Sequence, residues 1–210
     1  MNFERQAFRD FRASLASDAP TPGGGTASAA AGAMGASLLS MVLGLTLTKE
    51  KFAAVADELR PIADEADRAG TRLEALMNED AASFDAMVSA RKLPKETDEE
   101  KAARSEAMQA AALHAAEVPM ETARCAATLL SRVPLVAEKG NPNAASDAGV
   151  AALLLAAAAE GALLNVGINL GSIKDPAAVQ AMEKETARIS GDVERLRAQV
   201  IALVRKSFSK

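Results

Sequence analysis

The sequence predicts an all-α protein, a bundle of about five long antiparallel helices with two buried central helices, associated as a homodimer. Hydrophobic residues make up 49% of the 210 residues but aromatic residues only 3%, and alanine dominates, a composition that favours helix. No segment alternates polar and apolar residues as a half-buried strand does. Residues 24–48 carry no charge, and residues 148–173 carry only Glu160 before Ile173. Helices that are apolar on every side belong in a core or a membrane.

Composition also limits the partners and the compartment. The length suits one domain, residues 1–210, and the net charge of -4 with no cluster of basic and aromatic residues argues against nucleic acid. A single cysteine, Cys125, cannot form an internal disulfide, which fits the cytoplasm. A single histidine, His114, predicts no metal site. No apolar signal-peptide core is visible near the first residue.

The two apolar runs are long enough to span a bilayer. The first is rich in Ala, Gly, Ser and Thr, and the second contains Glu160, Asn165 and Asn169. Neither has the flanking aromatic residues of a membrane span. We therefore expect buried helices of a soluble bundle and no membrane.

Residues 2–17 predict a short amphipathic helix, because Phe8, Phe11 and Leu15 recur at helical spacing. A loop of two prolines and three glycines, Pro20 to Gly25, then precedes Thr26 and the first apolar helix. Glycines at a helix start leave free N–H groups where the helix dipole favours a negative group. The loop is either a floor for an anionic or polar ligand or a flexible start that fits a crowded core.

Charged residues appear from Lys49 onward, together with an apolar stripe of alternating four- and three-residue spacing that predicts one long helix, kinked at Pro61. The stripe consists of Val55, Leu59, Ile62, Ala66, Ala69, Leu73 and Leu76. Asp80 falls inside its continuation and Asp85 on its flank. An acid on an apolar face is costly unless it is paired or used. Either the helix frays there, or the acids pair with Arg91 or Lys92, or they serve a site.

A turn at residues 93–97 is followed by a capping box of Thr97 and Glu100. The helix that follows should kink or break at Pro119. A breaker cluster, Gly140 to Asn143, then precedes the second apolar helix, with Ser146 as its N-cap and Asp147 in its first turn.

Asp147 and Asn165 are eighteen residues apart and project from one helix face, with Asn169 close to it. The last helix begins at Asp175 and Pro176 and carries a strict three-four stripe. Its one polar member, Thr186, has a hydroxyl that can bond back to its own helix. Residues 24–48 and 148–170 are too apolar to be covered within one chain, so they should form the centre of a homodimer.

Five stretches agree in order with the cyclodeaminase part of the formiminotransferase-cyclodeaminase family, which includes free-standing methenyltetrahydrofolate cyclohydrolases. They are residues 11–52, 80–87, 93–101, 138–151 and 162–170. The chain resembles this family over nearly its whole length. It departs from the family pattern at Gly44 and Phe52, where relatives usually carry Asn and Tyr.

The resemblance implies a dimeric helical enzyme that acts on folate one-carbon units, with the tetrahydrofolate derivative as substrate and no metal or other cofactor. The reaction is hydrolysis of 5,10-methenyltetrahydrofolate, or cyclisation of 5-formiminotetrahydrofolate with release of ammonia. A folate-binding helical dimer without activity is the third alternative.

The resemblance also suggests roles for single residues. Catalysis is assigned to Asp147 first and Asp85 second, with Lys49 or Lys51 supplying a proton or binding the glutamate carboxylates. The expected substrate-binding residues are Pro22, Gly23, Gly24, Gly25, Thr26, Asn141, Asn143 and Ser146. Asp147 alternatively serves only as a helix-start charge, and the two lysines only as a solvated helix end.

Overall fold

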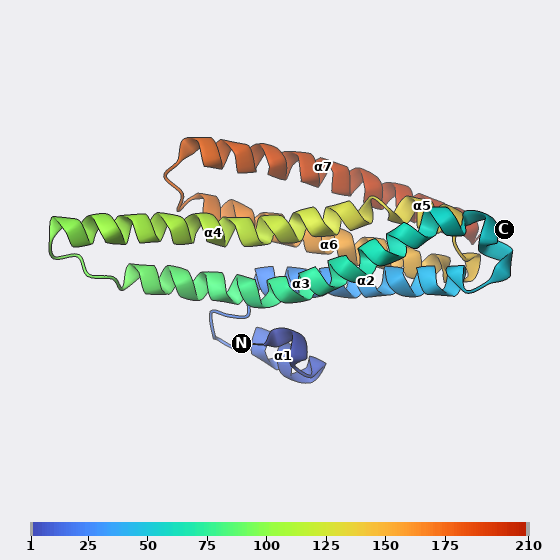
Figure 1. Ribbon diagram of the computed structural model, residues 1–210, viewed down its shortest axis with the longest axis horizontal. Coiled ribbons are helices and arrows are strands. Elements are labelled where there is room, and N and C mark those ends of the chain that lie inside the picture. The colour runs from blue at the N-terminus through green and yellow to red at the C-terminus, as the bar shows by residue number, and fades with distance from the viewer. Residues whose placement is uncertain (1, 209–210) are drawn as a thin grey trace.

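Residues 2–208 are described by a computed structural model, in which they form an elongated bundle of helices (Figure 1). Five helices are long, as predicted: α2 (Gly24–Leu47), α3 (Ala56–Arg91), α4 (Asp98–Leu130), α6 (Ala145–Leu170) and α7 (Pro176–Ser207). The shorter elements are η1 (Phe3–Arg5), α1 (Phe8–Leu15), η2 (Glu50–Val55), α5 (Val133–Lys139) and η3 (Pro142–Ala144). No strand occurs between residues 2 and 208, which confirms the all-α class.

The two apolar helices, α2 and α6, run antiparallel and pack side by side. Small residues allow their backbones to approach closely. A Cβ atom at Gly35 of α2 would lie 2.9 Å from Leu155 Cγ and 3.2 Å from the carbonyl oxygen of Ala151, both on α6. Helix α3 covers α2 from a second side, while α4 and α7 cover α6.

Each apolar helix leaves one side uncovered by the rest of the bundle. In the most apolar stretches of α2 and α6, only 44% and 50% of the residues are buried. By length and composition both helices could cross a membrane, a test that core helices of soluble proteins also pass. The prediction of two buried central helices therefore holds for their bundle-facing sides alone. The outer sides expose Met34, Met41, Leu45, Val150, Leu153, Leu164 and Ile168.

The N-terminal segment is not the single helix that the spacing predicted. Gln6 and Ala7 are extended and separate η1 from α1. Phe3, whose backbone N–H donates to Asn78 Oδ1 at 2.8 Å, is buried beside Phe11, with ring centroids 6.1 Å apart. Phe8 is 74% exposed. Because η1 brings Phe3 onto α3, Phe3 takes the buried position that the stripe assigned to Phe8.

Of the two outcomes predicted at Pro119, a kink or a break, the break does not occur: α4 continues through the proline to Leu130. A proline has no N–H to donate, so the carbonyl oxygen of Ala115, four residues earlier, loses its helical partner. That oxygen accepts a hydrogen bond from Asn169 Nδ2 of α6 at 2.6 Å. The neighbouring helix therefore supplies the donor that the proline lacks, and α4 stays continuous. Helix α3 likewise runs through Pro61.

Most of the remaining local predictions are confirmed. The capping box of Thr97 and Glu100 forms with both hydrogen bonds, and Asp175 accepts the N–H of Ala177 at 2.9 Å at the start of α7. The stripe of α3 faces the core, although Val55 and Ala69 are only half-buried. Thr186 is an exception, because its buried hydroxyl makes no hydrogen bond within residues 2–208.

Candidate functional site

The predicted site residues lie in two groups at opposite ends of α2. The glycine-loop end consists of Pro22–Thr26, and we include Asp80 of α3 and Asn165 of α6, which contact it. The lysine end consists of Lys49, Lys51, Asn141, Asn143, Ser146 and Asp147. The 24 residues of α2 separate the two ends by about 36 Å. The single chain therefore does not bring the predicted residues into one site.

At the glycine-loop end, a carboxylate lies against the start of α2. Thr26 is fully buried, and its hydroxyl donates to Asp80 Oδ2 at 2.7 Å. A Cβ atom at Gly25 would lie 2.1 Å from Asp80 Oδ1, closer than any real contact. Helix α2 has no side-chain N-cap at Gly23. Gly25 is thus required because only a residue without a side chain lets the Asp80 carboxylate approach the uncapped helix start.

The Asp80 carboxyl titrates abnormally. Burial raises its pKa above the usual value, and hydrogen bonding from Thr26 opposes that shift only in part. No charged group between residues 2 and 208 contributes to the shift. A carboxyl of raised pKa beside an accessible surface is suited to both accepting and returning a proton.

The third element at this end is Asn165. Its side-chain amide lies beside Gly24, with Nδ2 3.4 Å and Oδ1 3.6 Å from a Cβ atom built there. Nδ2 donates to the carbonyl oxygen of Gly161 at 2.8 Å, which fixes the amide. Gly24 itself is exposed. The glycine-loop end therefore presents to solvent a helix start, an amide and a carboxyl of raised pKa, contributed by three helices.

At the lysine end, Asn141 is committed to the fold. Its side chain is buried. Its backbone N–H donates to Thr46 Oγ1 at 2.9 Å, and its Nδ2 donates to the carbonyl oxygen of Leu45 at 3.2 Å. Its Oδ1 accepts a hydrogen bond from the N–H of Asn143 at 3.2 Å. This network ties the loop before α6 to the last turn of α2. The polar groups of Asn141 are thus already occupied.

The predicted N-cap at Ser146 is wrong, because α6 begins at Ala145 with Ala144 as its N-cap. The preceding η3, capped by Asn141, feeds directly into α6, so Ser146 falls inside the first turn. Asp147 lies there too, as predicted, and is half-buried. Asn143 and Ser146 are exposed.

Lys49 and Lys51 are exposed at the start of η2. Neither pairs with a carboxylate within residues 2–208. Lys51 Nζ lies 4.8 Å from the ring centroid of Phe52. The lysine end therefore offers two free cations, one half-buried carboxylate and exposed polar side chains.

Asp85, the second predicted catalytic residue, is exposed on α3 and belongs to neither end. The sequence placed Asp80 on the apolar stripe and left three outcomes open: fraying of the helix, a pair with Arg91 or Lys92, or a role in a site. Its partner is instead Thr26, on a different helix. The useful signal was the position of the acid on the core-facing side of its helix, whereas Asp85 lay on the flank.

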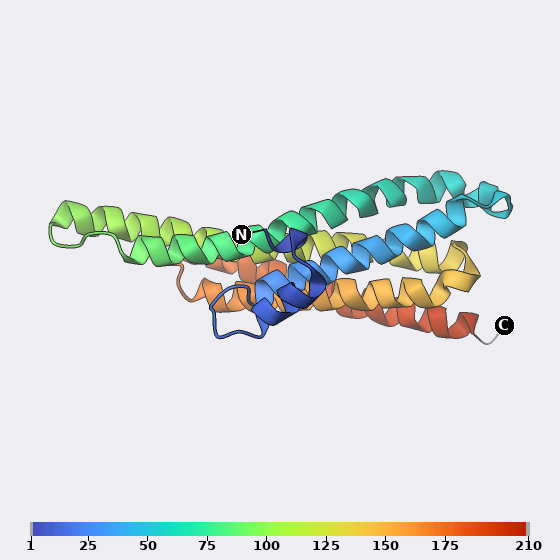
Figure 2. The same ribbon diagram turned by 90° about the horizontal axis from the view of Figure 1, so that it is seen from below.

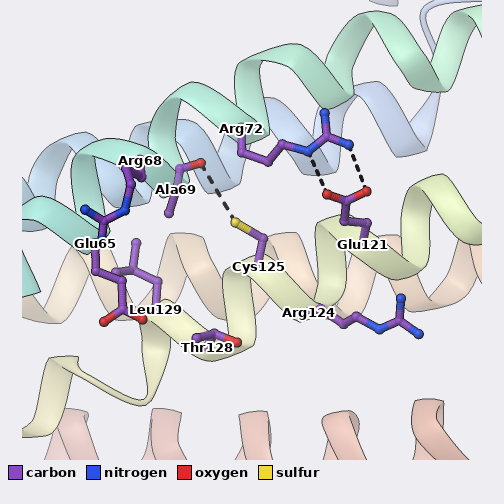
Figure 3. Close-up of a pocket in the computed structure, with 9 residues that line it drawn as sticks. All are labelled: Glu65, Arg68, Ala69, Arg72, Glu121, Arg124, Cys125, Thr128 and Leu129. Atoms are coloured by element: carbon purple, nitrogen blue, oxygen red, sulfur yellow. Dashed lines mark hydrogen bonds and ion pairs between the residues drawn. The ribbon is translucent and has the colours of Figure 1, made fainter.

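A cavity of about 380 Å³ between α3 and α4 contains none of the predicted residues (Figure 3). Arg72 crosses it and binds two carboxylates, Glu79 and Glu121. Burial raises the pKa of the Cys125 thiol to about 11, and Sγ donates to the carbonyl oxygen of Ala69 at 3.8 Å. With its central guanidinium neutralised and its thiol protonated, this cavity is a weaker candidate than the glycine-loop end.

Comparison with known proteins agrees with the residue patterns. The sequence pattern of the Formiminotransferase-cyclodeaminase family matches residues 7–188 of this chain. A methenyltetrahydrofolate cyclohydrolase of Methylorubrum extorquens is 38% identical over 204 residues, which cover 97% of this chain and 98% of that protein. The formimidoyltransferase-cyclodeaminase of Sus scrofa is 36% identical over 169 residues, 80% of this chain but only 31% of that longer protein.

The fold is shared with a solved structure. The crystal structure of formiminotetrahydrofolate cyclodeaminase from Thermotoga maritima superposes with a TM-score of 0.86 at 30% identity, covering 97% of this chain and 98% of that one. The family match and the full-length similarities together assign the activity class. The chain belongs to the formiminotransferase-cyclodeaminase family and is a folate one-carbon enzyme, either a methenyltetrahydrofolate cyclohydrolase or a formiminotetrahydrofolate cyclodeaminase.

Proposed function

We propose that this protein hydrolyses 5,10-methenyltetrahydrofolate to 10-formyltetrahydrofolate in the cytoplasm. The observation that carries the proposal is the half-buried Asp80 carboxyl held against the start of α2. The full-length similarity to a free-standing cyclohydrolase supports the choice of reaction.

The chemistry needs one group that moves a proton twice. Water adds to the cationic methenyl carbon, a C–O bond forms, and Asp80 accepts the proton of the attacking water. The bond from that carbon to N5 then breaks, N5 takes the proton from Asp80, and N10 keeps the formyl group. As the C–N5 bond breaks, the hydroxyl of the adduct loses its proton to solvent and becomes the formyl C=O, which accounts for the one proton released overall. A carboxyl of raised pKa serves both steps, because it is basic enough to accept a proton and acidic enough to return it.

The remaining polar groups are suited to holding the substrate. Lys49 and Lys51, which pair with no carboxylate in the described part of the chain, can bind the glutamate carboxylates of folate. Asn143 and Ser146 present exposed polar side chains that suit the edge of the pterin ring. Asp147 remains a candidate for stabilising the cationic substrate.

The test follows the absorbance of methenyltetrahydrofolate with purified protein. Wild-type protein should accelerate the loss of the band, and Asp80→Asn should lower turnover by about 10²- to 10⁴-fold, the usual worth of a general acid or base. Asp85→Asn, five residues along the same helix but exposed, is the matched control and should retain wild-type turnover. Turnover of Asp80→Asn within about threefold of wild type would rule out this role.

Cyclodeamination of 5-formiminotetrahydrofolate is the second candidate, supported by the similarity to the Thermotoga cyclodeaminase. There N10 attacks the formimino carbon and ammonia leaves, with the same need for proton transfer. Measuring ammonia release from 5-formiminotetrahydrofolate beside hydrolysis of the methenyl compound separates the two reactions. Ammonia release without hydrolysis would favour this second candidate.

A further inference from the structure

The N-terminal segment, residues 2–16, plays no part in the reaction described above, yet the bundle holds it against α3. Figure 2 shows its helix α1, in dark blue, in front of the first turns of α2. Phe3 and Phe11 are only 3% and 9% exposed, whereas no other residue of α1 is buried. Two aromatic side chains therefore fix a segment that is otherwise largely solvated.

Asn78 of α3 binds this segment through both groups of its side-chain amide. Its Oδ1 accepts a hydrogen bond from the backbone N–H of Phe3 at 2.8 Å, and its Nδ2 donates to the carboxylate of Glu4. The bond from Asn78 is the main cause of the lowered pKa of Glu4. The amide is thus fully used to hold the segment, two residues before Asp80.

The segment contacts the bundle beside Asp80. Phe3 and Phe11 belong to one apolar cluster with Ala29, Ala33, Leu73, Leu76, Met77, Ala81 and Val118. Asp80 follows Leu76 and Met77 by four and three residues, so its side chain projects from the same face of α3, at the edge of this cluster. Thr26, which donates to Asp80, likewise precedes Ala29 of the cluster by one turn of α2. The two aromatic side chains therefore close the apolar side of the Asp80 site.

Charged groups on the surrounding elements do not explain the behaviour of Asp80. Residues 24–48, which include α2, carry no charge. Glu4 of η1 is bound by Asn78, Glu79 of α3 by Arg72, and Glu160 of α6 by Ser190. Arg12 of α1 and His114 of α4 are exposed. The carboxyl therefore depends on the apolar groups and the hydrogen bond that surround it.

We propose that Phe3, Phe11 and Asn78 are positioning residues for the reaction, because they hold the N-terminal segment against α3 and so keep Asp80 fixed and shielded from water beside Thr26. When the segment detaches, water reaches the carboxyl from the side of the apolar cluster, and the carboxyl loses its fixed position. This inference rests on the proposed function for the catalytic role of Asp80. The effect of the segment on the Asp80 carboxyl does not depend on that role.

Two variants detach the segment in different ways. Phe3→Ala removes the buried ring, whereas Asn78→Leu keeps the approximate size of the side chain and removes both hydrogen bonds. Each should lower turnover of methenyltetrahydrofolate by roughly 10- to 100-fold, the usual cost of misplacing a catalytic group. The acidic limb of the pH–rate profile should also move to lower pH, because contact with water lowers the pKa of Asp80 toward its ordinary value of 3.8.

The same segment offers two matched controls. Phe3→Leu keeps an apolar side chain in the cluster and should retain most of the turnover and the wild-type pH–rate profile. Phe8→Ala removes an aromatic ring that is 74% exposed, so it should change neither turnover nor the profile. A thermal melt of every variant measures how much stability each substitution removes.

Titration of Asp80 gives a readout that does not depend on activity. In the full chain labelled with ¹³C at its aspartate carboxyl carbons, the resonance that Asp80→Asn lacks belongs to Asp80. Its titration midpoint should fall in Phe3→Ala and Asn78→Leu and stay at the wild-type value in Phe8→Ala. Wild-type protein that turns over no methenyltetrahydrofolate would contradict the proposed function, and this titration would still decide the present inference.

A purely structural role of the segment predicts a different result. The melting temperatures of Phe3→Ala and Asn78→Leu would then fall, while turnover, the pH–rate profile and the titration of Asp80 would remain those of wild type. That outcome would overturn the proposal. If Phe3→Ala does not fold, Asn78→Leu decides alone, because it leaves every member of the apolar cluster in place.

Discussion

The hydrogen bond from Asn169 to Ala115 makes a quantitative prediction about the continuity of α4. Asn169→Leu keeps the approximate size of the side chain and removes the donor that compensates for Pro119. Ala115 is 7% exposed, so its carbonyl oxygen would be left buried and without a partner. Such a loss costs about 1–3 kcal/mol. For a chain of this length, 2 kcal/mol corresponds to a fall in melting temperature of roughly 4–8 °C.

A double-mutant cycle isolates this cause from the general cost of changing a half-buried residue. Pro119→Ala restores the N–H four residues after Ala115, so the carbonyl regains an intrahelical donor. In that background Asn169→Leu should cost less than about 0.5 kcal/mol, which gives a coupling free energy of about 1–2 kcal/mol between the two positions. The assay is urea unfolding of all four proteins, followed by circular dichroism at one protomer concentration, since a dimer's apparent stability depends on concentration.

The reasoning is refuted if Asn169→Leu costs the same in both backgrounds within about 0.5 kcal/mol. That result would mean that Asn169 contributes through packing alone and that α4 tolerates Pro119 for another reason. Asn165→Leu serves as the comparison on the same helix, because its Nδ2 donates to the carbonyl oxygen of Gly161 on its own helix. Its cost should not change with the residue at position 119.

Three further outcomes follow from single contacts. Gly25→Ala should reduce turnover at least tenfold because its methyl group must displace the Asp80 carboxylate. Gly191→Ala on α7, whose Cβ would meet no atom within 4 Å, should retain activity and structure, and equal activities of the two variants would contradict this. The folded state holds the Asp80 proton more tightly than the unfolded state, so ionisation of this group lowers stability as pH rises from about 3.8, its ordinary pKa, through the raised native value. Thermal melts of Asp80→Asn should therefore gain on wild type across that pH range, and a constant difference would contradict the assigned cause. Thr186→Val removes a buried hydroxyl that makes no hydrogen bond within residues 2–208, so it should leave the free energy of unfolding unchanged or raise it by up to about 2 kcal/mol. A clear fall in the free energy of unfolding would indicate a hydrogen bond that the structure does not contain.

Local patterns in the sequence were sufficient for the five long helices and for the starts of α4 and α7. The capping box at Thr97 and the start of α7 at Asp175 depend on side chains within three residues of the backbone groups that they bind, so the sequence alone determines them. The stripe of α3 was equally readable, because a helix of period 3.6 places such residues on one face whatever packs against it. Ser146 shows the limit of this reasoning, since a good N-cap residue is displaced when another helical turn runs directly into the helix.

Contacts between distant segments were decided only by the tertiary structure. The sequence showed a proline in α4 and an asparagine in α6. It did not show that the asparagine, 50 residues later, donates the hydrogen bond that the proline cannot. It showed Asp80 on an apolar stripe, but not that the carboxylate accepts a hydrogen bond from Thr26 and packs against Gly25. It also grouped the glycine loop with the segment that contains Asp147, because both match one family, whereas the rigid length of α2 holds them apart. Short-range hydrogen bonds and helical periodicity depend on neighbouring residues, so the sequence alone determined them. Which helix packs against which depends on the packing of the whole chain, so only the tertiary structure decided it.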